Sequence, residues 1–164
     1  MEATLGRLIT CKSCVKAIRP IAQGGMAEVS LSLLASRRAS DQDVRDFAQQ
    51  MVQDHSQANR QLRRLAMRKG LSLPSGMDPP HQLAMNRLRR RNGTVFDRTY
   101  MREMVQDHDA TLALFRDYAR NGDDPELRAW ATATLPTLRH HWRMANRTAG
   151  SIGGASPYDN GRRY

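Results

Sequence analysis

Aromatic residues are scarce in this chain of 164 residues, since phenylalanine, tryptophan and tyrosine together make up only 5% of it. Leucine, alanine and methionine supply most of the apolar content, and these residues favour packed helices over sheets. No apolar run approaches the length of about 18 residues that a membrane-spanning helix needs. We therefore expect an all-α protein with one main domain and no transmembrane helix.

The sequence also lacks the motifs that identify common reactions. It contains no HExxH motif, no glycine-rich phosphate loop and no ordered serine–histidine–aspartate set. Its two cysteines form a single pair, Cys11 and Cys14, which could be half of a zinc ribbon or the core of a redox motif. No second pair and no βαβ pattern accompanies it, so we interpret both as incidental thiols. Nothing here identifies a reaction, and a binding protein is favoured over an enzyme.

Acidic residues are nearly absent between residues 60 and 91, in a chain whose net charge is +10. This interval holds nine basic side chains, and Asp78 is its only acid. Such a surface attracts nucleic acid, an anionic membrane or an acidic partner. Basic side chains also suit the last turns of helices without any partner. The candidate anion-binding patch consists of its arginines: Arg60, Arg63, Arg64, Arg68, Arg87, Arg89, Arg90 and Arg91.

Apolar residues recur at helical spacing in four long segments. We predict long helices at residues 20–38, 40–69, 94–121 and 125–148, and a short helix at 79–91. The 24-residue insertion at 70–93 is long enough to cross a bundle, which predicts a ferritin-like four-helix bundle with an additional short helix between helices two and three. The bundle domain spans 20–148. Residues 1–19 form an N-terminal segment without clear pattern, and residues 149–164 a disordered tail.

One pentapeptide, Met-Val-Gln-Asp-His, occurs twice, ending at His55 and again 53 residues later at His108. Apolar neighbours at helical spacing place both histidines on the inner face of a long helix. His141 lies on the inner face of the last helix by the same argument, and Glu28 lies on the first helix. Three imidazoles and one carboxylate would suit a single transition-metal ion, namely Zn, Cu, Fe or Mn.

The alternative is that these histidines hydrogen-bond to Glu28, to the neighbouring Asp54 and Asp107 or to water, and only hold the helices in register. A di-iron oxidase site is excluded because such sites need Glu-x-x-His motifs, whereas valine stands three residues before both repeated histidines. Asp54 and Asp107 point about 100° away from the histidines that follow them, so we interpret them as residues that orient a metal ligand or contact a neighbouring helix. His81 and His140 are expected to face solvent.

Several segments occur together in one order: Gly24 to Val29, Phe47 to His55, Phe96 to Met101, the second pentapeptide, and Leu135 to His141. In this combination the chain resembles the bacterial family called domain of unknown function 4142, over about residues 20–146. The resemblance implies a ferritin-like bundle, usually exported or envelope-associated, with no established activity. The positions it singles out are Glu28, Asp54, His55, Asp97, His108 and His141.

The resemblance also implies a periplasmic or envelope location, although no signal peptide is visible in this chain, so a cytoplasmic location stays open. Our first hypothesis is a bundle protein that binds one transition metal through Glu28, His55, His108 and His141. The alternative is a non-enzymatic interaction protein whose arginine-rich surface meets an acidic partner or an anionic surface. Assembly into a homo-oligomer is compatible with either hypothesis.

Overall fold

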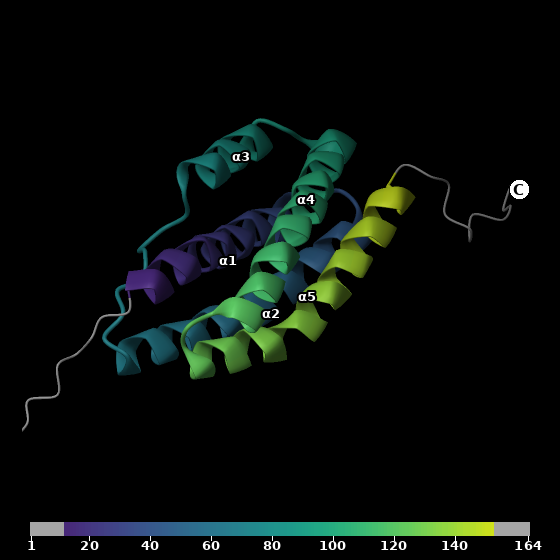
Figure 1. Ribbon diagram of the computed structural model, residues 1–164. Helices are drawn as coiled ribbons and strands as arrows, with labels where there is room; N and C mark the ends of the chain where they lie inside the picture. Colours follow the sequence, from purple (N-terminus) through teal and green to yellow (C-terminus); the bar gives the residue numbers. More distant parts are fainter. Residues whose placement is uncertain (1–11, 153–164) are drawn as a thin grey trace, which may run out of the picture.

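The computed structural model describes residues 12–152, which form five α-helices and no strand. The helices are α1 (Lys12–Arg38), α2 (Gln42–Arg68), α3 (Pro79–Arg89), α4 (Gly93–Asn121) and α5 (Pro125–Ser151). Four are long and lie side by side, whereas the short α3 lies against α1 and α4 (Figure 1). The predicted all-α fold, with a short helix between the second and third long helices, is confirmed.

The long helices pack as two hairpins joined by a crossing connection. α1 packs mainly on α2, α4 packs mainly on α5, and the hairpins meet through the pairs α1 and α4 and α2 and α5. At one end, Lys69 Nζ just after α2 lies 2.8 Å from Asp124 Oδ2 just before α5. At the other end, Arg38 Nη2 of α1 lies 2.6 Å from Asn92 Oδ1 just before α4. The connection that carries α3 therefore runs the length of the bundle, as the long insertion predicts.

The start of α2 is held by an aspartate from another helix. Asp97 of α4 accepts hydrogen bonds from the backbone N–H groups of Ser40 and Asp41 and from the Ser40 hydroxyl. The N-cap of α2 is Asp41, whose carboxylate accepts from Asp43 N and Val44 N. The helix predicted from residue 40 therefore begins at Gln42, and the hydroxyl of Ser40 binds Asp97 instead of capping the helix. Asp97, one of the positions that the family resemblance singles out, therefore connects α4 to the start of α2.

The first helix begins at Lys12, eight residues before the predicted start, and Pro20 lies inside it. The prediction failed because Cys14, Ile18 and Ile21 continue the helical stripe and are all buried. Their burial outweighs the single backbone hydrogen bond that proline removes. Cys14 is also disulfide-bonded, so it is not the incidental thiol that we expected. Cys11 lies outside the described residues.

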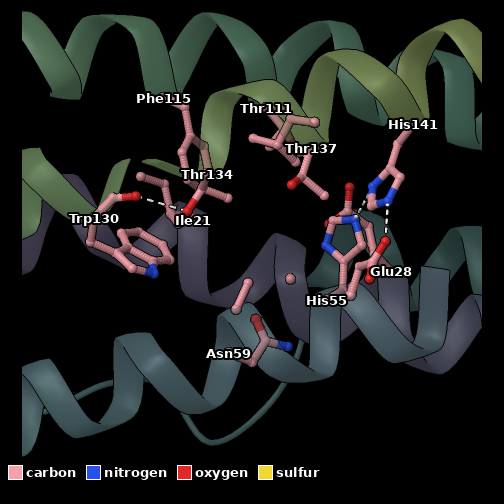
Figure 2. Close-up of a pocket in the computed structure, with 14 residues that line it drawn as sticks. Ile21, Glu28, His55, Asn59, Thr111, Phe115, Trp130, Thr134, Thr137 and His141 are labelled. Atoms are coloured by element: carbon pink, nitrogen blue, oxygen red, sulfur yellow. Dashed lines mark hydrogen bonds and ion pairs between the residues drawn. The ribbon is translucent and has the colours of Figure 1, made fainter. Parts of the chain in front are cut away.

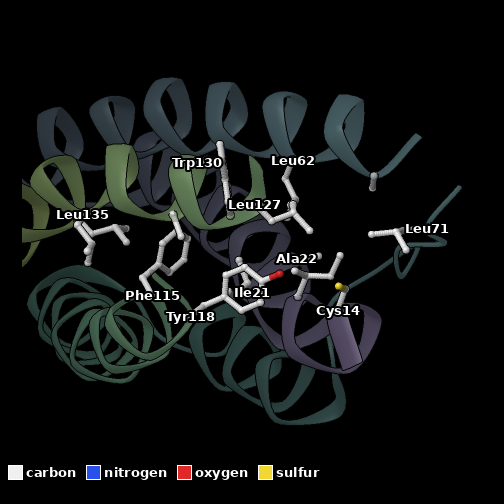
Figure 3. Close-up of a cluster of buried hydrophobic side chains, with 14 of the residues drawn as sticks. Cys14, Ile21, Ala22, Leu62, Leu71, Phe115, Tyr118, Leu127, Trp130 and Leu135 are labelled. Atoms are coloured by element: carbon white, nitrogen blue, oxygen red, sulfur yellow. The ribbon is translucent and has the colours of Figure 1, made fainter. Parts of the chain in front are cut away.

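The core consists of two apolar clusters, one toward each end of the bundle. One contains Ile18, Leu62, Phe115 and Leu127 among others (Figure 3). The second is built by residues of the opposite half: Leu31, Phe47, Met51, Leu88, Phe96, Tyr100 and Met104. On each long helix, one buried polar residue separates the two clusters.

The last helix, α5, continues to Ser151, past the predicted end at residue 148, and residues 153–164 of the predicted tail lie outside the described part. None of the described helices is both long and apolar enough to cross a membrane.

Candidate metal centre

Four buried polar side chains form a layer across the middle of the bundle, one from each long helix. Glu28 comes from α1, His55 from α2, His108 from α4 and His141 from α5, and all four are almost completely inaccessible to water. The spacing of the apolar residues explains this placement, because each polar residue stands on the same stripe as the buried residues before and after it. All four residues that the sequence predicts for a metal site are therefore brought together.

Three of these side chains and Asp54 form a continuous chain of hydrogen bonds. Nδ1 of His55 lies 2.7 Å from Glu28 Oε2, and its Nε2 lies 3.2 Å from His141 Nδ1. Nε2 of His141 then lies 2.8 Å from Asp54 Oδ2. Both ends of the chain are carboxylates, which accept hydrogen bonds, so Nδ1 of His55 and Nε2 of His141 carry hydrogens.

The fourth member, His108, makes a different contact. Its Nδ1 lies 2.9 Å from the carbonyl oxygen of Met104, one turn earlier in α4. Because a carbonyl oxygen only accepts, this nitrogen carries the hydrogen, and the lone pair of the neutral ring is on Nε2. Nε2 is buried and has no hydrogen-bond partner among the described residues. Such an unpartnered buried atom is uncommon in a folded protein and calls for an explanation.

The three imidazoles converge on one another. One ring nitrogen from each lies within 4.8 Å of the others, and the ring centroids are 5.1 to 5.6 Å apart. Figure 2 shows His55 and His141 reaching toward one another from α2 and α5, with Glu28 beside them. Among the described residues, His55, His108 and His141 are the group that could hold a metal ion.

Charge is distributed unevenly over this layer. Burial opposes ionisation of Glu28, but attraction to His55 and His108 outweighs it and lowers the pKa of Glu28 to about 2. Burial also opposes a charge on His55, yet attraction to Glu28 outweighs it and raises the pKa of His55. Burial lowers the pKa of His108, and burial with repulsion by His55 lowers the pKa of His141 to about 4. His55 is thus the imidazole of the three whose pKa is raised, so its surroundings favour the positively charged form.

The aspartates beside the repeated histidines differ in their surroundings. Asp54 is partly exposed, and hydrogen bonds from Gln50 and His141 outweigh burial and lower the pKa of Asp54. Asp107 is more deeply placed, and burial together with repulsion by Glu28 raises its pKa to about 7. Its Oδ1 lies 3.8 Å from Nε2 of His81 on α3. Asp54 therefore supports the histidine layer, whereas Asp107 is a contact to α3.

One histidine was misplaced by the sequence analysis. His81, expected in solvent, is only 20% exposed and lies between Asp78 and Asp107, with its Nδ1 2.5 Å from Asp78 Oδ1. The Asp78 cap and the following prolines indicated the start of α3 but not the surface onto which it folds. His140 is exposed, as expected.

The eight arginines of the candidate anion-binding patch are all exposed, but they do not gather in one place. Arg68 pairs with Glu126 at the start of α5, with 2.9 Å between Nη2 and Oε2. At the other end of the bundle, Arg38 donates to the carbonyl oxygens of Arg89 and Arg91. The set is therefore spread along the bundle rather than forming one compact patch.

The fold and the site together define a class: a helical bundle with a long crossing connection and a buried histidine cluster at mid-height. The chain belongs to the family described as "Domain of unknown function (DUF4142)", whose model matches residues 12–148. No curated protein sequence matches the chain. Among solved structures, it resembles the crystal structure of a DUF305 fragment from Deinococcus radiodurans. The two share 17% identity with a TM-score of 0.76, over 86% of this chain and 97% of the other, which is a likeness of fold.

Proposed function

We propose that the protein binds one transition-metal ion through Nε2 of His55, Nε2 of His108 and Nδ1 of His141. One observation carries this proposal: in each ring the nitrogen that faces away from the cluster is already held by an acceptor. The acceptors are Glu28 for His55, the carbonyl of Met104 for His108 and Asp54 for His141. Metal-binding histidines are oriented in this way in proteins, with the second nitrogen donating to a carboxylate or a carbonyl.

The role of Glu28 in this proposal differs from its role in the sequence-based hypothesis, where it is a ligand. Oε2 of Glu28 is engaged by Nδ1 of His55, so we assign Glu28 to orienting that ring and balancing the charge of the ion. The proton that His55 holds on Nε2 would leave when the ion binds, because a ligating nitrogen must offer its lone pair.

The distances are close to those that an ion requires. Ligand atoms at about 2.0 to 2.1 Å from a tetrahedral ion lie about 3.4 Å from one another. His55 Nε2 and His141 Nδ1 are 3.2 Å apart, and one ring nitrogen from each of the three histidines lies within 4.8 Å of the others. The widest separation between the three ring nitrogens would have to shorten by at most about 1.4 Å to complete the site. Three neutral imidazoles suit Zn²⁺ or Cu²⁺ better than Mn²⁺, which prefers oxygen ligands.

The test is metal content, measured by inductively coupled plasma mass spectrometry on untagged protein dialysed against equimolar Zn²⁺ or Cu²⁺ without chelator. We expect about one ion per chain for the native protein, as for a single three-histidine site. His108→Ala should lose the ion, because the substitution removes one of the three ligands. It breaks no close ion pair, since Nδ1 of His108 lies 3.7 Å from Glu28 Oε1. The matched control is His140→Ala, which removes an exposed imidazole next to His141 and should retain the ion. Equal metal content in both variants, or none in the native protein, would refute the proposal.

Other sequence-based expectations stay predictions. They are a periplasmic or envelope location, self-association, and binding of an acidic partner by the arginines. A partner held by arginines alone would be released by molar salt, which screens exposed charges.

A further inference from the structure

A cavity of about 30 Å³ lies against the histidine layer. At one end it is lined by Glu28, His55 and His141, and at the other by Ile21, Phe115 and Trp130 (Figure 2). This volume is enough for about one or two water molecules. The space directly beside the proposed ion is therefore neither filled by side chains nor wide enough for a large ligand.

Polar groups around this cavity lack protein partners. Nε1 of Trp130 is a buried donor without an acceptor among the described residues. Glu28, which also lines the cavity, has a buried Oε1 atom that likewise has no hydrogen-bond partner among the described residues. Buried polar groups are normally satisfied, so unsatisfied ones around a water-sized space indicate an occupant that accepts or donates hydrogen bonds.

Asn59 reaches this position because the facing residue on α1 has no side chain. A Cβ atom added to Gly25 would lie 2.2 Å from Asn59 Oδ1, closer than atoms can approach. Any larger residue at position 25 would push the amide of Asn59 away from the cavity wall. The absence of a side chain at Gly25 thus leaves room for the amide of Asn59 beside the cavity.

The cavity also has a route to solvent. A surface groove of about 230 Å³ between α2 and α5 is lined by Asp54, Gln57, Ala58, Gln61, Ala133, Thr134 and Thr137. Four of these residues, Asp54, Ala58, Thr134 and Thr137, also line the cavity. The wall between groove and cavity is thus one layer of side chains thick, and it includes the carboxylate that holds His141.

We infer that the bound ion keeps one coordination position open toward this cavity, and that the position takes water or one small exogenous ligand of two or three heavy atoms. The inference rests on the proposed metal binding. Three protein ligands plus one exchangeable position is the arrangement of reactive zinc sites, whereas structural sites are closed by four protein ligands. Because the far wall is apolar, a weakly hydrated ligand suits the space better than a strongly hydrated one. The bound ion would then coordinate a small exogenous ligand, so the role of the protein would not be limited to storing metal.

The test uses the full chain loaded with one equivalent of Cu²⁺, which binds nitrogen sites more tightly than Zn²⁺ does. Metal stoichiometry is measured first, and the visible absorption is then followed while sodium azide is added. We expect a saturable azide-to-copper charge-transfer band with a stoichiometry of one. A copper-loaded protein whose spectrum azide leaves unchanged would show that the site is closed and overturn the inference, while leaving the proposed metal binding intact. A native chain that takes up no metal would overturn both.

Substitutions that enlarge side chains in the cavity wall then test whether azide binds in the cavity. Thr137→Leu and Ala58→Leu each enlarge a side chain on the shared wall, one on α5 and one on α2. Both should keep copper but weaken azide binding by about tenfold or more, since filling the cavity removes the space for the ligand. The matched control is Ala133→Leu, which enlarges a side chain of the groove that does not line the cavity and should bind azide as the native protein does. Azide binding that is equally strong in Thr137→Leu and Ala133→Leu would place the open position elsewhere and overturn the inference.

Discussion

The two copies of Met-Val-Gln-Asp-His are identical in sequence and opposite in electrostatics. In the copy on α2, burial opposes a charge on His55, but attraction to Glu28 raises its pKa, and hydrogen bonds lower the pKa of Asp54. In the copy on α4, burial lowers the pKa of His108 and raises that of Asp107 to about 7. The surroundings thus favour the charged forms of His55 and Asp54 in one copy, and the uncharged forms of His108 and Asp107 in the other.

The cause lies outside the pentapeptides. One turn before Asp54 stands Gln50, whose amide donates to the carboxylate at 2.7 Å. The matching position on α4 is Glu103, whose charge repels that of Asp107. Across the bundle, His141 donates to Asp54, whereas Asp107 has only the more distant His81, and its Oδ2 has no partner among the described residues. A repeated motif therefore sets the spacing of side chains on a helix, and the facing helices set their charge.

The largest difference between the copies should appear when each histidine is removed from the metal-free protein. His55→Ala leaves the buried carboxylate of Glu28 without its closest partner, which should cost about 3–5 kcal/mol of unfolding free energy. His108→Ala removes a neutral ring with one hydrogen bond to a backbone carbonyl, and should cost about 1–2 kcal/mol. Urea unfolding at pH 8 measures both values. Equal losses of unfolding free energy would mean that the ion pair between His55 and Glu28 does not stabilise this layer more than the contacts of His108 do.

A smaller difference is expected between the two aspartates in metal affinity. Asp54→Asn weakens the acceptor that orients His141, and should reduce affinity about 10–100-fold. Asp107→Asn changes a contact to α3 and should alter affinity by less than about threefold, since Asp107 holds none of the three rings. Competition with a chromophoric chelator gives both dissociation constants. If Asp107→Asn has the larger effect, His81 and Asp107 belong to the metal site and the assignment of orienting residues is wrong.

The smallest expected difference concerns pH and stability in the metal-free protein. The folded pKa of Asp107, about 7, lies above the ordinary value of 3.8. Its contribution is therefore fully present below pH 3.8 and is lost as the pH rises through about 7. Asp107→Asn keeps the uncharged shape, so in urea unfolding it should match the native protein at about pH 3, below both pKa values, and exceed its stability at pH 8.5, above both, by about 1 kcal/mol or more.

Asp54 should show the opposite sign in the same unfolding experiment. Its folded pKa lies below 3.8, so its contribution is present above pH 3.8 and is lost as the pH falls through the folded pKa. Asp54→Asn should therefore be less stable than the native protein at pH 8.5, and the two should converge at low pH. Parallel curves for the two variants would show that the surroundings of the aspartates do not differ in the way that the geometry indicates.

Much of this fold could be predicted from the chain because helical periodicity is a local property. The apolar stripes identified all four long helices, and the length of the insertion indicated the crossing connection. Periodicity also placed Glu28, His55, His108 and His141 inside, since each occupies a core position of its own helix. The errors occurred where a local signal competed with packing: Pro20 suggested a helix start, yet the buried stripe continues through it.

The roles within the site depend on contacts between helices, which no local pattern describes. The pKa values of the identical Asp-His pairs shift in opposite directions because Asp107 is more deeply buried than Asp54 and is repelled by Glu28. The residue one turn earlier adds to the difference, since Gln50 donates to Asp54 whereas Glu103 repels Asp107. The residue types and their spacing determined that three imidazoles and a carboxylate would share one layer. Only the tertiary structure decided which nitrogen of each ring is held, that His81 packs against Asp107, and that a small cavity lies beside the cluster. Those features arise from distances between residues far apart in the chain, and they exist only once the two hairpins have packed together.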